Sequence, residues 1–140
     1  MFRRSRLVHV AALCLAAAGC AVISEDQTAE SLKATADSHV AFTTAVTPGN
    51  ACPRVARMLM WCAGGPNYHY RCNISPDGGH AELAAALEAV YRTEFFMVTE
   101  FAKGAAGTEV KVHQRDSVLV YDYAPMIEAY LNANRDCRSR

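Results

Sequence analysis

The chain has 140 residues, which is room for a single domain, and its 14 basic and 14 acidic side chains balance to a net charge of zero. Three of the basic residues stand within the first six positions, so the rest of the chain carries 11 basic against 14 acidic residues, a net charge of −3. No basic cluster lies in that remainder. The composition therefore argues against a nucleic-acid-binding protein, and no nucleic-acid partner is predicted.

The N-terminus has the three-part layout of a secretory signal. Three arginines precede an apolar run from Leu7 to Ala18, which ends at Gly19-Cys20. The run is shorter than the roughly 20 residues that a permanent transmembrane helix needs. Residues 1–19 are therefore predicted to be a signal peptide that is removed on export.

The end of this run, Leu15 to Cys20, resembles the lipobox of bacterial lipoproteins, in which a small residue precedes a cysteine. It departs from the family pattern at Ala17, where the family usually has leucine. The resemblance implies that Cys20 carries a lipid as the first residue of the mature protein, and that Ala21 directs it to the outer membrane, facing the periplasm. The alternative is an ordinary secretory signal that is cut at an Ala-x-Ala-like site.

Four further cysteines, Cys52, Cys62, Cys72 and Cys137, form an even set in an exported chain, so two disulfides are expected. A turn at residues 64–66 favours the pairing Cys62–Cys72 with Cys52–Cys137, and the main alternative joins Cys52 to Cys72. Zinc is disfavoured because these cysteines stand ten or more residues apart, without the closely spaced ligand pairs of structural zinc sites. We predict no metal and no cofactor.

Residues 20–37 are small, polar and acidic. They predict a flexible tether between the lipid and the domain, with room for a short helix over 29–36, because little of their surface is apolar enough to pack. The folded domain is then predicted to span residues 38–140.

The domain is expected to begin with a strand and a helix. Residues 39–46 alternate between apolar and polar side chains, which is strand periodicity, until Pro48-Gly49-Asn50 breaks the pattern. A helix follows, capped by Asn50 or Cys52 and with Pro53 in its first turn, and its apolar stripe includes Val55 and Leu59.

Residues 68–74 alternate again and predict a second strand, which Asp77-Gly78-Gly79 turns back. Residues 80–90 are ambiguous. Their alanines favour a helix, whereas the preceding turn and an alternation of apolar side chains favour a hairpin strand. We favour the strand, because residues 68–74 otherwise lack a hairpin partner.

Two more strands are predicted over residues 93–101 and 108–115, with Val110 and Val112 facing the core. A last helix follows Asp122. The order strand, helix, strands, helix predicts a single two-layer α+β domain, with an antiparallel sheet of about four or five strands and two helices.

This element order, together with Gly-Thr-Glu-Val-Lys-Val at Gly107 to Val112, resembles helix-grip-like domains. The family includes domains of a lipoprotein in the outer-membrane β-barrel assembly machinery. The resemblance implies a fold that can open a cavity between sheet and helix, and so a small-ligand binder is one hypothesis. A shared fold does not by itself transfer a function.

The candidate binding residues are aromatic side chains that combine an apolar body with a polar tip, a character that suits interfaces as well as cores. They are Trp61, Tyr68, Tyr70, Tyr121 and Tyr123. The leading hypothesis is a non-catalytic, lipid-anchored domain that binds another envelope protein or a cell-wall component.

The alternative from a different class is a small envelope hydrolase. It would use a cysteine nucleophile paired with His69, His80 or His113, or a histidine–carboxylate site. The chain has no Gly-x-Ser-x-Gly elbow, and Glu94, Glu100 and Glu109 are interpreted as the solvated face of a hairpin. No catalytic residue is therefore predicted.

Overall fold

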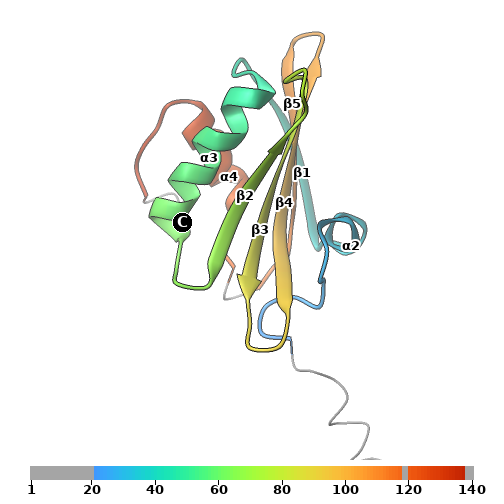
Figure 1. The fold of residues 1–140 in the computed structure, drawn as a ribbon. Helices are drawn as coiled ribbons and strands as arrows, with labels where there is room; N and C mark the ends of the chain where they lie inside the picture. The colour runs from blue at the N-terminus through green and yellow to red at the C-terminus, as the bar shows by residue number, and fades with distance from the viewer. Residues whose placement is uncertain (1–20, 118–119, 138–140) are drawn as a thin grey trace, which may run out of the picture.

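A five-stranded antiparallel sheet in the order β1-β5-β4-β3-β2 organises the fold (Figure 1). The computed structural model describes residues 21–117 and 120–137, so the predictions for the signal peptide and Cys20 lie outside the described residues. The strands are β1 (Ser38–Thr44), β2 (Tyr68–Ile74), β3 (His80–Glu88), β4 (Thr93–Gly104) and β5 (Gly107–Gln114). The helices are α2 (Ala29–Thr35), α3 (Pro48–Ala63) and α4 (Tyr123–Leu131). The predicted α+β class and element order are confirmed, and α2 lies where the sequence left room for a short helix over 29–36.

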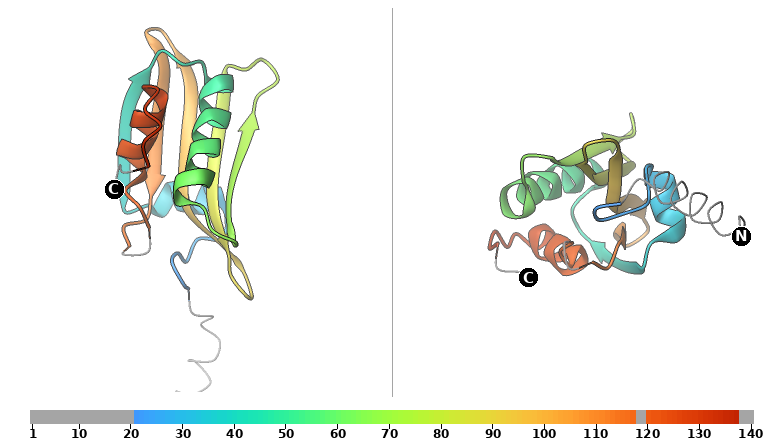
Figure 2. Two further views of the ribbon diagram at one scale, coloured as in Figure 1. Left: turned by 90° about the vertical axis from the view of Figure 1, so that its left-hand side faces the viewer. Right: turned by 90° about the horizontal axis from the view of Figure 1, so that it is seen from below.

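The core lies between one face of the sheet and the helices α3 and α4, which pack beside each other on that face (Figure 2). Val55 and Leu59 of α3 are fully buried, as their helical spacing predicted. Val110 and Val112 of β5 meet them from the sheet. The apolar faces predicted for the helix and for the strands therefore pack against each other in one core, and this packing fixes the position of both helices.

Residues 80–90, for which the sequence left helix and strand open, form strand β3 over His80–Glu88, as the hairpin argument favoured. Ala81, Leu83 and Ala85 alternate with outward-facing residues and are fully buried. Gly78 in the preceding turn has a φ of +67°, a conformation that favours glycine. Pairing on both edges, with β2 and with β4, supplies the hydrogen bonds that override the helix propensity of alanine.

Helix α3 begins earlier than predicted. Thr47 is its N-cap and Pro48 occupies the first turn, so the prediction that Asn50 or Cys52 caps the helix is wrong. Proline is favoured at this position because the missing N–H has no partner inside the helix anyway. Pro48-Gly49-Asn50, which marks the end of the strand pattern, is therefore already helical.

The prediction of a flexible tether over residues 20–37 is wrong for its described part, 21–37. Leu32 of α2 is fully buried, on the sheet face opposite α3 and α4 (Figure 1). Asp26 is also buried and forms an ion pair with Arg115, which bonds Asp37 as well. Ion pairs thus hold a segment whose low apolar content had argued against packing.

Glu94 provides a second attachment for this segment. Its side chain is 0% exposed, and its carboxylate accepts the backbone N–H groups of Val22, Ile23 and Ser24 at 2.7–3.1 Å. The interpretation of Glu94 as part of a solvated hairpin face is therefore wrong.

Of the helices within 21–117 and 120–137, none is both long and apolar enough to cross a bilayer.

Candidate functional site: a cationic cleft between the helices

A cleft of about 750 Å³ is lined by residues of α3 and α4. It lies at the end of the molecule where α3 begins and α4 ends, and Figure 2 shows these two helix ends side by side. Its lining comes from the loop between β1 and α3, from one side of α3, and from the end of α4 with the residues that follow it. The volume lies in the range of pockets that hold small molecules or short peptide segments.

Among the described residues, three arginines and no acidic residue line the cleft. Arg54 and Arg57 stand three residues apart on α3, off the buried stripe, so both point away from the core to the same side. Arg135 comes from the chain after α4. All three are exposed and form no ion pair with another described residue. Because the chain after residue 6 carries a net charge of −3, this is a local concentration of positive charge.

Tyr130 of α4 also lines the cleft, and its hydroxyl is buried without a hydrogen-bond partner among the described residues. The side chain is only 1% exposed, and burial, together with the nearby negative charge of Asp136, raises the pKa of the phenol, so the hydroxyl keeps its proton and remains a donor. A buried hydroxyl without a partner costs about 1–3 kcal/mol. An acceptor that reached this hydroxyl from the cleft would remove that cost.

The first turn of α3 adds a further positive contribution. Thr47 and Asn50 line the cleft, and the helix start has neither a side-chain cap nor an acidic residue in its first turn. The N-terminus of a helix carries the equivalent of roughly half a positive charge. The helix dipole and the arginines therefore act in the same direction.

The opposite wall is fixed by the way α4 ends. Ala133 has a φ of +62°, the N–H of Asn134 bonds the carbonyl of Ala129, and the N–H of Ala133 bonds that of Tyr130. This is a Schellman turn with alanine where glycine is usual. It sends the following residues back across the cleft, which places Arg135 opposite the arginines of α3.

The arrangement is suited to holding an anion. Guanidinium groups bind carboxylates and phosphates through two parallel N–H donors, and the phenol and helix dipole favour the same charge. The lining also includes Val46, Pro53 and Met58, which offer apolar surface beside the cations. It contains no carboxylate, histidine or thiol that would act as a general base or nucleophile.

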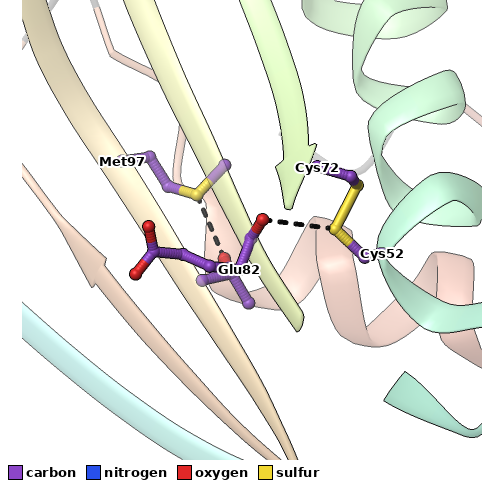
Figure 3. Close-up of a disulfide and its surroundings, with 5 residues drawn as sticks. Cys52, Cys72, Glu82 and Met97 are labelled. Carbon is purple, nitrogen blue, oxygen red and sulfur yellow. Dashed lines mark hydrogen bonds between the residues drawn. A yellow bond between two sulfur atoms is a disulfide. The ribbon is translucent and has the colours of Figure 1, made fainter. Parts of the chain in front are cut away.

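The four cysteines form two disulfides, as predicted, but with the other connectivity: Cys52–Cys72 and Cys62–Cys137, with Cα–Cα distances of 5.9 and 5.1 Å. The favoured pairing of Cys62 with Cys72 is wrong, and the alternative that joined Cys52 to Cys72 is confirmed. Figure 3 shows this bridge between α3 and β2, with the Cys52 sulfur 3.5 Å from the carbonyl oxygen of Glu82.

The different rise of a helix and a strand explains the pairing. α3 and β2 are joined by a short connection and run in opposite directions, so residues equally far from the connection lie level (Figure 1). The helical stretch from Cys62 back to Cys52 spans about 15 Å. The strand from Tyr68 to Cys72 spans about 13 Å. Cys72 therefore lies level with Cys52, while Cys62 is free to meet Cys137 in the tail after α4.

The predicted aromatic residues do not share one surface. Tyr70 and Tyr123 are 8% and 1% exposed, and their hydroxyls lie 3.2 Å apart in the core, so placing them on a binding surface is wrong. Tyr68 and Tyr121 are half-buried at the edge of the same cluster. Trp61 is 84% exposed near the end of α3 and does not line the cleft.

The histidine–carboxylate pairs lie on the sheet face that carries α2. His113 bonds Glu100 through Nε2 at 3.0 Å and His39 through Nδ1 at 2.7 Å, while His69 bonds Glu88. Burial works against ionisation of Glu100, but the bond to His113 and the charge of Lys33 hold its pKa below the ordinary value. This chain of bonds includes no hydroxyl or thiol.

Cys52, Cys62, Cys72 and Cys137 are all disulfide-bonded, so none of them is a free thiol for the predicted cysteine nucleophile. In the part of the chain that the structure describes, no group of three or more histidine, cysteine, aspartate or glutamate side chains is placed to hold a metal ion.

No family model matches the chain, and no curated protein and no solved structure matches it either. The function of the cleft is therefore inferred from its lining residues alone. The spacing of Arg54 and Arg57 off the apolar stripe of α3 is a signal that the sequence did contain. Nothing in the sequence placed Tyr130 and Arg135 beside them, because that depends on the turn after α4.

Proposed function

We propose that this protein is a lipid-anchored, periplasm-facing envelope protein whose domain binds the carboxylate of a peptide segment in the cleft between α3 and α4. The observation that carries the binding function is the buried hydroxyl of Tyr130, which has no partner among the described residues, in a cleft lined by three arginines that form no ion pair with another described residue. The anchor rests on the lipobox-like sequence before Cys20, and the outer membrane on Ala21. The two disulfides support an oxidising compartment.

A non-catalytic role is the better-supported reading of the cleft. Its chemistry is that of recognition, with donors and cations but no residue in the lining that can accept a proton from a substrate. The hydrolase alternative would use the pairs His113–Glu100 or His69–Glu88, which lie on the other face of the sheet. The small-ligand hypothesis places a cavity between sheet and helix, but side chains such as Phe96 and Tyr123 fill that space.

Two sources share the peptide-carboxylate chemistry. One is the stem peptide of a cell-wall component, and the other is an acidic segment of an envelope protein. The cleft size favours a short segment over a broad protein surface, because interfaces between proteins bury about 800 Å² on each partner. Both sources agree with the partner classes expected from the sequence.

Calorimetric titration of the mature chain in detergent tests the proposal, with a cell-wall stem peptide in one arm and a tripeptide of L-glutamate in the other. Substituting Arg54, Arg57 or Arg135 by Gln is expected to weaken binding about two- to fivefold, since an exposed ion pair contributes about 0.5–1 kcal/mol. Added salt should weaken it further. Arg71→Gln is the matched control, because Arg71 is exposed on the other face of the sheet.

Tyr130→Phe separates binding from stability. It removes a buried donor that has no partner in the free protein, so the free energy of unfolding should stay equal or rise. Binding of the preferred peptide should nevertheless weaken about tenfold, because a hydrogen bond to a charged acceptor is lost. Unchanged affinity in this variant, or an equal loss in Arg71→Gln, would rule out the cleft as the site.

A further inference from the structure

The turn between β3 and β4 exposes two large side chains at its tip. The N–H of Ala89 bonds the carbonyl of Arg92, which leaves Val90 and Tyr91 at the two central positions. Val90 is 88% exposed and Tyr91 is 97% exposed. Side chains of this size are rarely presented together at a tip unless they meet a partner.

The start of the described chain is fastened to the base of this same turn. Arg92 donates to the carbonyl of Ser24 at 2.7 Å, and Glu94 holds the N–H of Val22 at 2.9 Å. Val22, itself 55% exposed, therefore lies at this end of the domain. Figure 1 shows the β3–β4 turn beside the point where the described chain begins.

Because residues 22–37 are attached to the domain, they do not act as a tether, and the distance between a lipid on Cys20 and the domain is short. Cys20 precedes Val22 by two residues, and two residues of extended chain span at most about 7 Å. A lipid on Cys20 would therefore bring the bilayer against this end of the domain, because Val22 is bonded to Glu94 and cannot move away with the lipid. Residues 22–37 are held to the domain, so this length of chain does not separate the two.

We infer that Val22, Val90 and Tyr91 form a contact with the membrane interface, and that the anchored domain sits directly on the bilayer. This rests on the lipid anchor of the proposed function, but not on the cleft. Tyrosine is a residue favoured at the membrane–water interface, where its ring and hydroxyl meet different surroundings. The cleft lies at the opposite end, where α3 begins, and so faces away from the membrane (Figure 2).

A tryptophan at the tip tests the contact. The acylated full-length product carrying Trp61→Phe and Tyr91→Trp is reconstituted into phosphatidylethanolamine–phosphatidylglycerol vesicles with or without brominated acyl chains. The matched control carries Trp61→Phe and Ala106→Trp, since Ala106 is exposed in the turn between β4 and β5 at the other end. Both substitutions are at exposed turn positions, and Tyr91→Trp keeps an aromatic ring.

The inference predicts that both variants float with the vesicles, and that brominated chains quench the tryptophan at position 91 but not the one at position 106. Iodide in the water should quench the two in the opposite order. Flotation with equal, weak quenching at both positions overturns the membrane contact and leaves the anchor standing. Failure to float shows that the anchor itself is wrong, and the contact inferred from it is then wrong as well.

Discussion

Glu94→Gln is expected to weaken the attachment of the N-terminal segment to the domain. The carboxylate accepts four donors, namely the N–H groups of Val22, Ile23 and Ser24 and the Nε of Arg92. Glutamine keeps the shape but offers one oxygen, and its NH₂ group faces donors. With the amide oxygen in the position of Oε2 the three backbone N–H groups keep an acceptor, but the NH₂ group then faces the Nε of Arg92, whose partner is lost together with the negative charge, at about 1–3 kcal/mol. We therefore expect the free energy of unfolding to fall by about 1–3 kcal/mol, against the 5–15 kcal/mol typical of a domain.

The effect of Glu94 should depend on pH with a defined sign. Burial alone would raise its pKa, but the backbone N–H donors and Arg92 hold the pKa below the ordinary value. A carboxyl whose pKa is lowered by folding contributes stability above its unfolded pKa of about 4.3, and this is lost as the pH falls through the folded value. The difference in the free energy of unfolding between wild type and Glu94→Gln should therefore be largest at neutral pH, and it should disappear as the pH drops below about 4.

Urea unfolding of both proteins from about pH 7 to about pH 3 measures this difference. Amide exchange of residues 22–24 reports local release. Glu109→Gln is the control, because Glu109 is an exposed glutamate on β5. A difference that stays constant across this range, or unchanged protection of residues 22–24, would show that Glu94 does not fasten the segment.

Two further predictions concern stability. Replacing Cys62 and Cys137 together by Ser opens a loop with a sequence separation of 75, so unfolding should become easier by about 4–5 kcal/mol; an unchanged urea midpoint would contradict this. Non-reducing peptide mapping of the wild type should recover Cys137 linked to Cys62, and a link from Cys137 to Cys52 would refute the connectivity. Ala133→Gly should raise the free energy of unfolding by about 0.5–1 kcal/mol in thermal melts, because the φ of +62° strains alanine but not glycine; a lower melting temperature would count against that strain.

Much of the fold follows from local patterns in the sequence. The alternation of Val110 and Val112, the helical spacing of Val55 and Leu59, and the turn at Gly78 each report a nearest-neighbour constraint, and the structure confirms all three. Such patterns predict helices and strands because each element buries one face, whatever partner it packs against.

The attachment of the N-terminal segment, residues 21–37, could not be predicted from local sequence patterns. The composition of the segment is polar, and within residues 21–37 Ser24 and Asp26 bond each other and Thr35, none of which fastens the segment to the sheet. Their partners, Arg92, Glu94 and Arg115, lie about seventy to ninety residues away. Only the folded sheet brings these charges to the same end, and buried charge pairs of this kind leave no periodic signature.

The sequence by itself determined the class of fold, the order of strands and helices, and the presence of two disulfides, because each depends on spacing along the chain. The tertiary structure decided which cysteines pair, since a helix and a strand advance at different rates and bring Cys72 level with Cys52. It also decided the cleft. Arg54 and Arg57 share a helix face by their spacing, but Tyr130 and Arg135 join them only because α4 packs beside α3 and ends in a tight turn.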